Sequence, residues 1–233
     1  MRSAKGLSGK KGFIVAIDGP AGAGKTTTAR LVAERLGFFH LDTGAMYRAI
    51  TLKVIENNID ISNSQQLQLM LNKTRVDLKW QQDEMHILLD GRDVTERIRS
   101  PDVNKLVSLV SAIGIVRKRM VVEQRRLARN RNVVCEGRDI GSVVFPDAGL
   151  KIYLDCALAE RARRRRAELK NGRLTLGAVK SNLAQRDHID TSRAVSPLRR
   201  VPDAILVDTT HLTIEEQVAL VCALVRRKLV IER

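Results

Sequence analysis

The sequence predicts an α/β protein built on a five-stranded parallel sheet flanked by helices. Short apolar runs rich in β-branched residues recur along the chain, and stretches compatible with helices separate them. The strands of a parallel sheet have continuous apolar sequences of this kind, because the helices that connect them cover both faces of the sheet. The five runs occupy residues 13–17, 38–41, 133–135, 151–154 and 204–207.

Length and composition favour one folded domain. The chain has 233 residues, of which 44% are hydrophobic, and a chain of this length can bury a core without disulfides or metals. No apolar run approaches the roughly 20 residues that a membrane-spanning helix needs. The first residues are basic and lack the apolar stretch of a secretory signal. We therefore expect a disordered basic tail over residues 1–11 and a single domain over residues 12–233.

The cysteines predict a reducing compartment. Cys135, Cys156 and Cys222 form neither a disulfide framework nor a C-x-x-C pair. Each lies in an apolar run, which favours a buried structural side chain over a catalytic or metal-binding one. We expect a cytoplasmic protein.

Three helices are predicted from their ends. A helix over Lys25–Leu36 follows the first strand after a glycine-rich turn. Ser100 before Pro101 predicts a capped start for one long helix running to about residue 130. Thr213 with Glu216 forms a capping-box pattern that opens a C-terminal helix ending near residue 229.

Residues 75–95 interrupt this alternation of strands and helices. Val76, Leu78 and Trp80 alternate with polar residues, residues 81–84 form a turn, and Asp90-Gly91 is a second turn signal. We expect a small antiparallel insertion that can move relative to the core.

Positive charge is concentrated in short stretches of the chain. The formal net charge is +15, and residues 117–131 and 161–173 each hold seven basic residues against one acidic residue. Such runs are typical of a solvated helix face or of a nucleic-acid patch. The chain has only four Phe, two Tyr and one Trp, and none lies among the basic runs to stack on a base.

A phosphate-binding loop follows the first strand. The pattern G-x-x-x-x-G-K-[ST] spans residues 19–26 and lies between a strand and a helix, which is the context that this motif requires. Its glycines let backbone N–H groups surround a phosphate, Lys25 can reach the β- and γ-phosphates, and the hydroxyl of Thr26 can bind Mg²⁺. No N-K-x-D guanine signature follows, which argues against GTP regulation.

Three further motifs identify a family resemblance. Residues 41–48 read LDTGAMYR, residues 136–141 read EGRDIG and continue to Phe145-Pro146-Asp147-Ala148, and Arg186-Asp187 is followed by RAVSPL at residues 193–198. With the phosphate loop, these motifs make the chain resemble bacterial-type cytidylate kinase from about residue 14 to the C-terminus.

The resemblance implies a fold, a domain layout and a reaction. The fold would be a P-loop NTPase core with a region that binds the nucleoside monophosphate over residues 42–115, including the insertion at 75–95, and a short lid over residues 160–174. The reaction would be Mg²⁺-dependent phosphorylation of CMP and dCMP by ATP. We expect a monomer with small-molecule substrates and no nucleic-acid partner.

The family pattern also implies the site residues. Contacts to the cytosine base fall on Ser108, Arg117 and Asp139. Contacts to ribose and phosphate of CMP fall on Thr43, Arg48, Arg138, Arg186, Asp190 and Arg193. ATP contacts fall on Gly19, Pro20, Ala21, Gly22, Ala23, Gly24, Lys25, Thr26, Thr27 and Arg161. Catalytic roles fall on Lys25, Arg164, Arg165, Arg186 and Arg193, and no general base is assigned.

These residue types suit the selection of cytosine. Cytosine presents an amino donor and a ring acceptor, whereas uracil has the reverse, so the Asp139 carboxylate and the Arg117 guanidinium favour cytosine. Without the motifs, Arg117 would be read as part of a charged helix face and Asp139 as a structural carboxylate in a turn.

Two alternative functions fit parts of the sequence. One is a basic RNA-binding P-loop protein, in which the arginine runs contact a phosphate backbone. The other keeps the fold but phosphorylates UMP, shikimate or another small acceptor.

Overall fold

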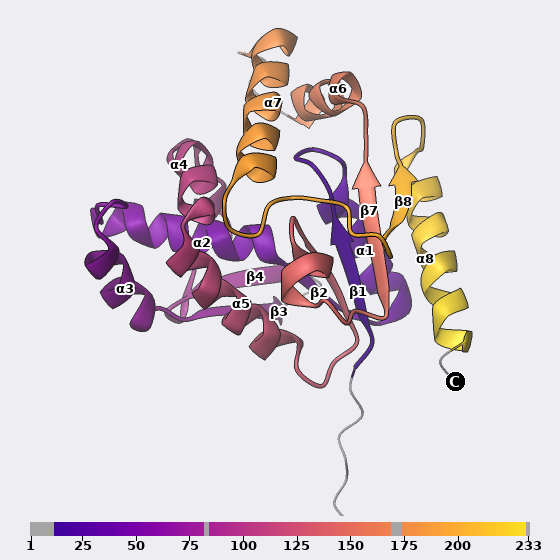
Figure 1. Cartoon of the computed structure of the whole chain (residues 1–233), viewed down its shortest axis with the longest axis horizontal. Helices are drawn as coiled ribbons and strands as arrows, with labels where there is room; N and C mark the ends of the chain where they lie inside the picture. Colours follow the sequence, from indigo (N-terminus) through magenta and orange to yellow (C-terminus); the bar gives the residue numbers. More distant parts are fainter. Residues whose placement is uncertain (1–11, 82–83, 169–173, 232–233) are drawn as a thin grey trace, which may run out of the picture.

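A five-stranded parallel sheet forms the centre of the protein, as the sequence predicts (Figure 1). The computed structural model describes residues 12–81, 84–168 and 174–231. The strand order is β2-β6-β1-β7-β8, and every neighbouring pair is parallel. The strands are β1 (Ile14–Asp18), β2 (Phe39–Asp42), β6 (Val133–Gly137), β7 (Leu150–Asp155) and β8 (Ile205–Asp208). Their ends lie within two residues of the predicted runs.

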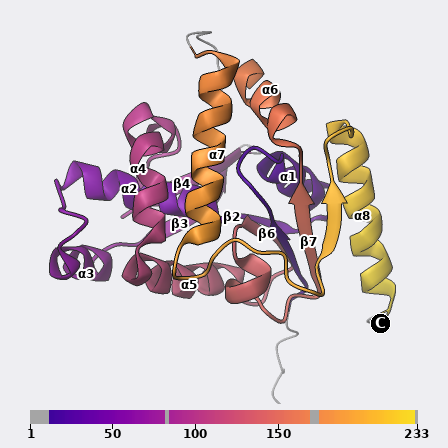
Figure 2. The ribbon, with the colours of Figure 1, turned by 45° about the horizontal axis from the view of Figure 1, so that its top comes forward.

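Helices cover both faces of this sheet. Val15 and Ile17 pack with α1 (Lys25–Leu36) and α8 (Ile214–Ile231) in one core layer. Ala16, which points to the opposite face, packs with α2 (Thr43–Glu56) and α5 (Gly114–Ala128) in a larger layer. Figures 1 and 2 both show α8 beside β8, the edge strand opposite β2. No helix among the described residues is long and apolar enough to cross a membrane.

Within the segment expected to form the insertion, the structure has a three-stranded antiparallel sheet. Its strands are β3 (Val76–Gln81), β4 (Glu84–Leu89) and β5 (Arg92–Asp93). Asp90 and Gly91 have φ values of 52° and 84°, as a two-residue hairpin turn requires. Helix α3 (Ser64–Asn72) precedes this sheet, and a short 3₁₀ turn, η1 (Arg97–Arg99), follows it. Residues 82–83 of the predicted first turn lie outside the described residues.

The single long helix expected from residue 100 to 130 is wrong. The structure has two helices, α4 (Pro101–Ala112) and α5, which are separated at Ile113, whose ψ is 124°. Gly114 starts α5, and glycine is unfavourable inside a helix by about 1 kcal/mol relative to alanine. The break leaves the backbone oxygen of Ser111 free to accept a hydrogen bond from Arg117 Nη1 at 2.9 Å.

One of the two predicted caps is confirmed. Thr213 Oγ1 accepts a hydrogen bond from the N–H of Glu216 at 3.2 Å, and the Glu216 carboxylate accepts from the N–H of Thr213 at 2.9 Å. Ser100 precedes α4 but its hydroxyl makes no capping bond. Its oxygen accepts from Arg97 instead.

Two helices stand at the carboxyl end of the sheet. They are α6 (Leu158–Glu168) and α7 (Leu176–Ser192), and Figure 1 shows them beyond the arrow tip of β7. A small apolar cluster of Ala162, Val179 and Leu183 joins them to Ala21 of the phosphate loop. The predicted tail at residues 1–11 and residues 169–173 of the predicted lid lie outside the described residues. All three cysteines are buried and unpaired, as expected.

Candidate active site

A cleft of about 1060 Å³ opens at the carboxyl ends of β1, β2 and β6. The phosphate loop, the start of α2, α4 and the arginines of α6 and α7 all contribute to its walls. Predicted residues that line it are Ala21, Gly22, Gly24, Lys25, Thr26, Thr27, Thr43, Arg48, Ser108, Arg117, Arg138, Asp139, Arg164, Arg165, Arg186, Asp190 and Arg193. The structure thus brings all nine residues of the expected CMP set into one cleft. Gly19, Pro20, Ala23 and Arg161 are not among the lining residues.

The phosphate loop curls tightly between β1 and α1. Gly24 directly precedes α1 with a φ of 87°, a conformation that glycine adopts readily. A side chain at Gly19 would place a Cβ 2.0 Å from the Leu154 oxygen, so the loop can leave the sheet only with glycine there. The amino group of Lys25 donates to the Pro20 oxygen at 2.6 Å. Burial, and then the charge of Arg138, lower the pKa of Lys25 to about 7.

Arg161 lies behind the phosphate loop. Its guanidinium donates to the backbone oxygens of Ala21 and Cys156, both at 2.9 Å, and to the Asp187 carboxylate at 2.6 Å. Asp187 also accepts from the N–H of Ala21 at 3.0 Å. Arg161 and Asp187 therefore hold the backbone of the loop from the side of α6 and α7.

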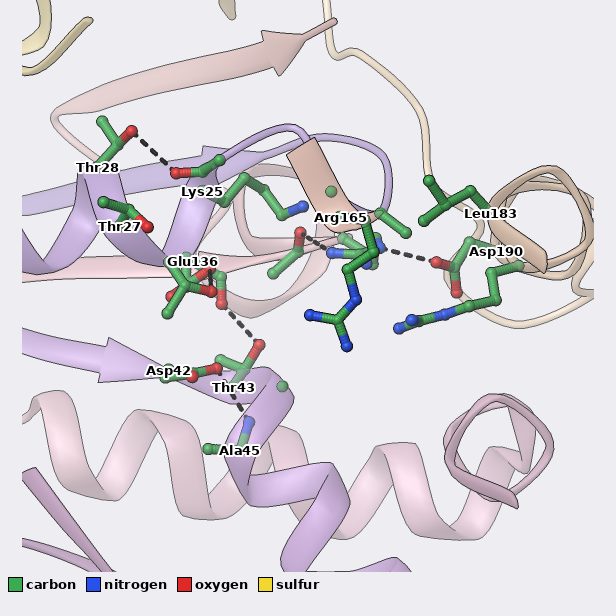
Figure 3. A pocket seen from close by; sticks show the side chains of 18 of the residues that line it. Lys25, Thr27, Thr28, Asp42, Thr43, Ala45, Glu136, Arg165, Leu183 and Asp190 are labelled. Atoms are coloured by element: carbon green, nitrogen blue, oxygen red, sulfur yellow. Dashed lines mark hydrogen bonds and ion pairs between the residues drawn. The ribbon is translucent and has the colours of Figure 1, made fainter. Parts of the chain in front are cut away.

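Glu136 connects the phosphate loop to β2. Its carboxylate accepts from the Thr26 hydroxyl at 2.9 Å and lies 3.1 Å from Nε2 of the buried His40. Its backbone oxygen accepts from the Thr43 hydroxyl at 2.7 Å, as Figure 3 shows. One residue thus positions a hydroxyl of the loop and a hydroxyl at the start of α2.

Arg117 and Asp139 form a buried ion pair at the wall of the cleft. The side chains are 2% and 4% exposed, and a charge of either sign at this depth needs a partner. The guanidinium carbon of Arg117 lies 5.3 Å from the centre of the Tyr47 ring, within the range of a cation–π contact. Nη2 of Arg193 lies 3.9 Å from Asp139 Oδ1, and this nitrogen has no hydrogen-bond partner within the described residues. Donor and acceptor groups are therefore held together beside open space.

A second group of arginines surrounds Asp190. Arg138 Nε donates to Asp190 Oδ2 at 2.7 Å, and Arg193 Nη1 lies 3.5 Å from Oδ1. Arg186 has a buried Nε without a partner in the part of the chain that the structure describes. Its burial, and then the charges of Arg138 and Arg48, lower its pKa to about 10. Several cations share one carboxylate here, so this region favours an anionic ligand.

The remaining predicted residues differ in what they contact. Arg48 donates to the side chain of Asn104 at 2.6 Å. Arg164 is bonded to Glu160 at 2.8 Å and to the Thr209 oxygen at 2.6 Å. Arg165 pairs with Glu168, and in Figure 3 its side chain extends toward the space between the phosphate loop and Thr43 at the start of α2.

Oxygen atoms suited to Mg²⁺ are present in the cleft. The Thr26 hydroxyl and the Glu136 carboxylate are adjacent, and Mg²⁺ prefers hard oxygen ligands. Among the described residues, no group of three or more His, Cys, Asp or Glu side chains could hold a metal by itself. These residues therefore fit an ion that enters with substrate phosphates, which is the usual way that Mg²⁺ is bound in kinases.

Three site residues carry no predicted role: Glu136 and Asp187, together with Asp18, which accepts two backbone hydrogen bonds from η2 (Ile140–Val144). Glu136 and Asp187 stand next to predicted residues within the recognised motifs, and Asp18 directly precedes the phosphate loop. That adjacency was the only signal in the sequence, because each acts on a segment distant in the chain.

Comparison with known proteins gives consistent matches over nearly the whole chain. The family model for cytidylate kinase matches residues 15–227. The cytidylate kinase of Carboxydothermus hydrogenoformans is 48% identical over 216 residues, which cover 92% of this chain and 97% of that protein. That of Desulfitobacterium hafniense is 48% identical over 221 residues, covering 94% and 95%. A solved shikimate kinase from Acinetobacter baumannii aligns over 95% of each chain with a TM-score of 0.43 and 14% identity.

Proposed function

The chain belongs to the cytidylate kinase family, and from this premise we propose that it transfers the γ-phosphoryl group of ATP to CMP and to dCMP. The products are ADP with CDP or dCDP. The observation that supports this acceptor most strongly is the buried pair of Arg117 and Asp139 in the same cleft as Lys25. That pair offers a carboxylate and a guanidinium to the two groups that distinguish cytosine from uracil.

Selection of the base follows from the cost of unpaired polar groups. The Asp139 carboxylate accepts the amino group of cytosine, and Arg117 donates to the ring nitrogen and the carbonyl oxygen. Uracil has a carbonyl oxygen where cytosine has the amino group, and an N–H where cytosine has the ring acceptor. Its carbonyl would therefore face the Asp139 carboxylate and its N–H would face the Arg117 guanidinium. A buried group left without a partner costs about 1–3 kcal/mol, and more where it is charged, so UMP is a poor acceptor.

The transfer itself needs alignment and charge neutralisation. A phosphate oxygen of CMP attacks the γ-phosphorus as the bond to the β-phosphate oxygen of ADP breaks, and charge spreads over the γ-phosphoryl oxygens. Lys25, Arg164, Arg165, Arg186 and Arg193 are cations of the cleft that stabilise this charge. The acceptor phosphate is already ionised, so no general base is required.

Thr26, with Glu136 beside it, would hold Mg²⁺ together with the ATP phosphates. The ion supplies further neutralisation of the phosphate charge when it is bound. Glu136 keeps the Thr26 hydroxyl facing the cleft. His40 holds the other carboxylate oxygen in turn.

We propose a division of the chain that follows the substrates. Residues 42–115 bind the nucleoside monophosphate, residues 160–174 form the lid, and the remainder of residues 12–233 forms the core. Movement of the lid and of the CMP region over the substrates would exclude water and limit hydrolysis of ATP. The monomeric state, the cytoplasmic location and the absence of a nucleic-acid partner stay predictions from the sequence.

A coupled assay of ADP release with CMP, dCMP, UMP and AMP tests the proposal. We expect CMP and dCMP to be preferred by at least about tenfold in kcat/KM, the scale of one lost buried hydrogen bond. A preference for UMP or AMP would refute the cytosine assignment. Shikimate as an added acceptor tests the other small-molecule kinase, and RNA binding with a steep salt dependence would favour the RNA-binding alternative.

A further inference from the structure

We propose that Asp18 is a positioning residue that holds the Asp139 carboxylate in the orientation that selects CMP. This inference rests on the proposed function, because it assumes that Asp139 reads the base. Asp18 is the last residue of β1 and directly precedes the phosphate loop. Its side chain therefore stands at the junction between the two substrate sites.

Asp18 binds the turn that follows Asp139. Its Oδ1 accepts from the N–H of Ile140 and its Oδ2 from the N–H of Gly141, both at 2.8 Å. Asp18 is 7% exposed, so water does not replace these bonds readily. Both carboxylate oxygens are thus used on two consecutive amides of a segment more than 120 residues away in the chain.

Asp139 occupies the position at which an aspartate ordinarily caps a turn. It directly precedes η2, and its backbone oxygen accepts from the N–H groups of Val143 and Val144 at 2.9 and 3.1 Å. At such a position the side chain normally accepts from the first free N–H groups of the turn. The Asp139 side chain makes no such bond. Asp18 already binds the N–H of Gly141, the second residue of the turn, which is one of the two groups that a capping side chain ordinarily binds.

The consequence is a carboxylate that is free for other partners. Asp139 pairs with the guanidinium of Arg117 and lies near Arg193 instead of folding back on its own turn. Without Asp18, the N–H groups of Ile140 and Gly141 would lack acceptors, and Asp139 is the nearest carboxylate in sequence that could cap them. Capping would withdraw it from Arg117 and from the base.

Close packing keeps the turn in this register. A Cβ at Gly137 would lie 2.6 Å from Ile140 Cδ1 and 2.7 Å from Thr43 Oγ1. A Cβ at Gly141 would lie 3.1 Å from Lys151 Cδ and 3.4 Å from Asp18 Oδ2. The turn therefore packs directly against Thr43 and Lys151, and the Asp18 carboxylate contacts the backbone N–H groups of the turn directly.

Asp18→Asn tests the proposal. The amide has nearly the same shape but offers one acceptor and one donor, so its NH₂ group faces a backbone N–H. We expect the KM for CMP to rise by about tenfold or more, the effect of one buried hydrogen bond, and the KM for ATP to change by less than about threefold. The kcat/KM preference for CMP over UMP should fall in parallel. Asp18→Ser, whose shorter side chain does not reach either amide, should raise the KM for CMP at least as much and serves if Asp18→Asn folds poorly.

A double-mutant cycle separates positioning from general destabilisation. If Asp18 acts through Asp139, then Asp18→Asn should change the KM for CMP by less than about twofold in an Asp139→Ala background. Val225→Ala, in the buried face of α8, is the control that lowers stability without changing the KM for CMP. Equal rises in both KM values, or a full effect of Asp18→Asn in the Asp139→Ala background, would overturn the inference.

The same measurements distinguish this inference from the proposed function. A wild-type enzyme without preference for CMP over UMP would refute the proposed function itself. A wild-type preference that Asp139→Ala abolishes but Asp18→Asn leaves intact would refute the role of Asp18 alone.

Discussion

Arg161 and Asp187 meet behind the phosphate loop, with Arg161 Nη1 2.6 Å from Asp187 Oδ2, and both bind the backbone of Ala21. Arg161 belongs to α6 and Asp187 to α7. The loop that would hold the ATP phosphates is thus bonded directly to α6, which carries Arg164 and Arg165, and to α7, which carries Arg186. The conformation of the loop depends on these helices as well as on its own glycines.

Asp187→Asn should weaken ATP binding. The carboxylate of Asp187 accepts from Ala21 with one oxygen and from Arg161 with the other. An amide has only one acceptor oxygen and no charge, so one of the two bonds is lost and the phosphate loop becomes less ordered before ATP binds. We expect the KM for ATP to rise by about tenfold, which corresponds to about 1.4 kcal/mol. Steady-state kinetics with varied ATP measure it. Gln185→Ala, an exposed position on α7, should leave both KM values unchanged. An unchanged KM for ATP in Asp187→Asn would contradict this role.

Lys25→Met should depress kcat without weakening the fold. Loss of a preorganised cation in a dry site costs about two or more orders of magnitude in turnover. Burial lowers the pKa of Lys25 to about 7, which means that the buried charge destabilises the folded protein. Methionine has a similar length and no charge, so the variant should be at least as stable as the wild type. Single-turnover kinetics and thermal unfolding measure the two effects. Near-normal turnover, or a large fall in the melting temperature, would argue against this assignment.

Asp139→Ala should destabilise the protein as well as impair CMP binding. The change leaves the Arg117 guanidinium buried without its carboxylate, which typically costs about 3–5 kcal/mol. Urea unfolding of Asp139→Ala and of the double variant Asp139→Ala/Arg117→Met separates the effect of the unpaired Arg117 charge from other effects of losing the Asp139 side chain. The double variant should recover most of the lost stability, since it removes the unpaired charge. If the single variant were as stable as the wild type, the pair would not be buried in solution.

Asp18 should give the protein a specific pH dependence of stability. Burial raises its pKa from 3.8 to about 6, with the two backbone bonds and Lys25 lowering it and the Asp139 charge raising it. Between these values the folded state binds a proton that the unfolded state has released, so the contribution to stability is lost as pH rises from about 4 to 6. The free energy of unfolding of the wild type should therefore fall by about 3 kcal/mol or less relative to that of Asp18→Asn as the pH rises over that range.

Urea unfolding of both proteins from pH 4 to 7 measures this difference. The other carboxylates are common to the two proteins, so their contributions cancel when the free energies of unfolding are subtracted. A difference that does not vary with pH would show that the carboxyl of Asp18 titrates at its ordinary pKa in the folded protein.

Local signals predicted the bounds of the five core strands and of α1 closely, but they gave no bounds for α2, α3, α6 and α7 and missed one break. The strands end near the predicted residues because glycines and polar residues bound each apolar run, and α1 has the predicted bounds. The break at Ile113 was missed, because Gly114 is the only local signal there and a single glycine is tolerated in many helices. The hydrogen bond from Arg117 to the Ser111 oxygen, which uses the carbonyl that the break frees, depends on tertiary packing.

The sequence by itself determined the five strand segments, the phosphate loop and the family motifs, since each of these is a short run of neighbouring residues. The order of the strands in the sheet joins segments that are distant in the chain. The tertiary structure alone decided that Asp18 caps the turn after Asp139, that Glu136 holds the hydroxyl of Thr26, and that Arg161 lies behind the loop. Each of these contacts joins segments more than 100 residues apart. The partner of a buried charge is set by which strands and helices become neighbours on folding, and residue types in sequence do not specify that choice.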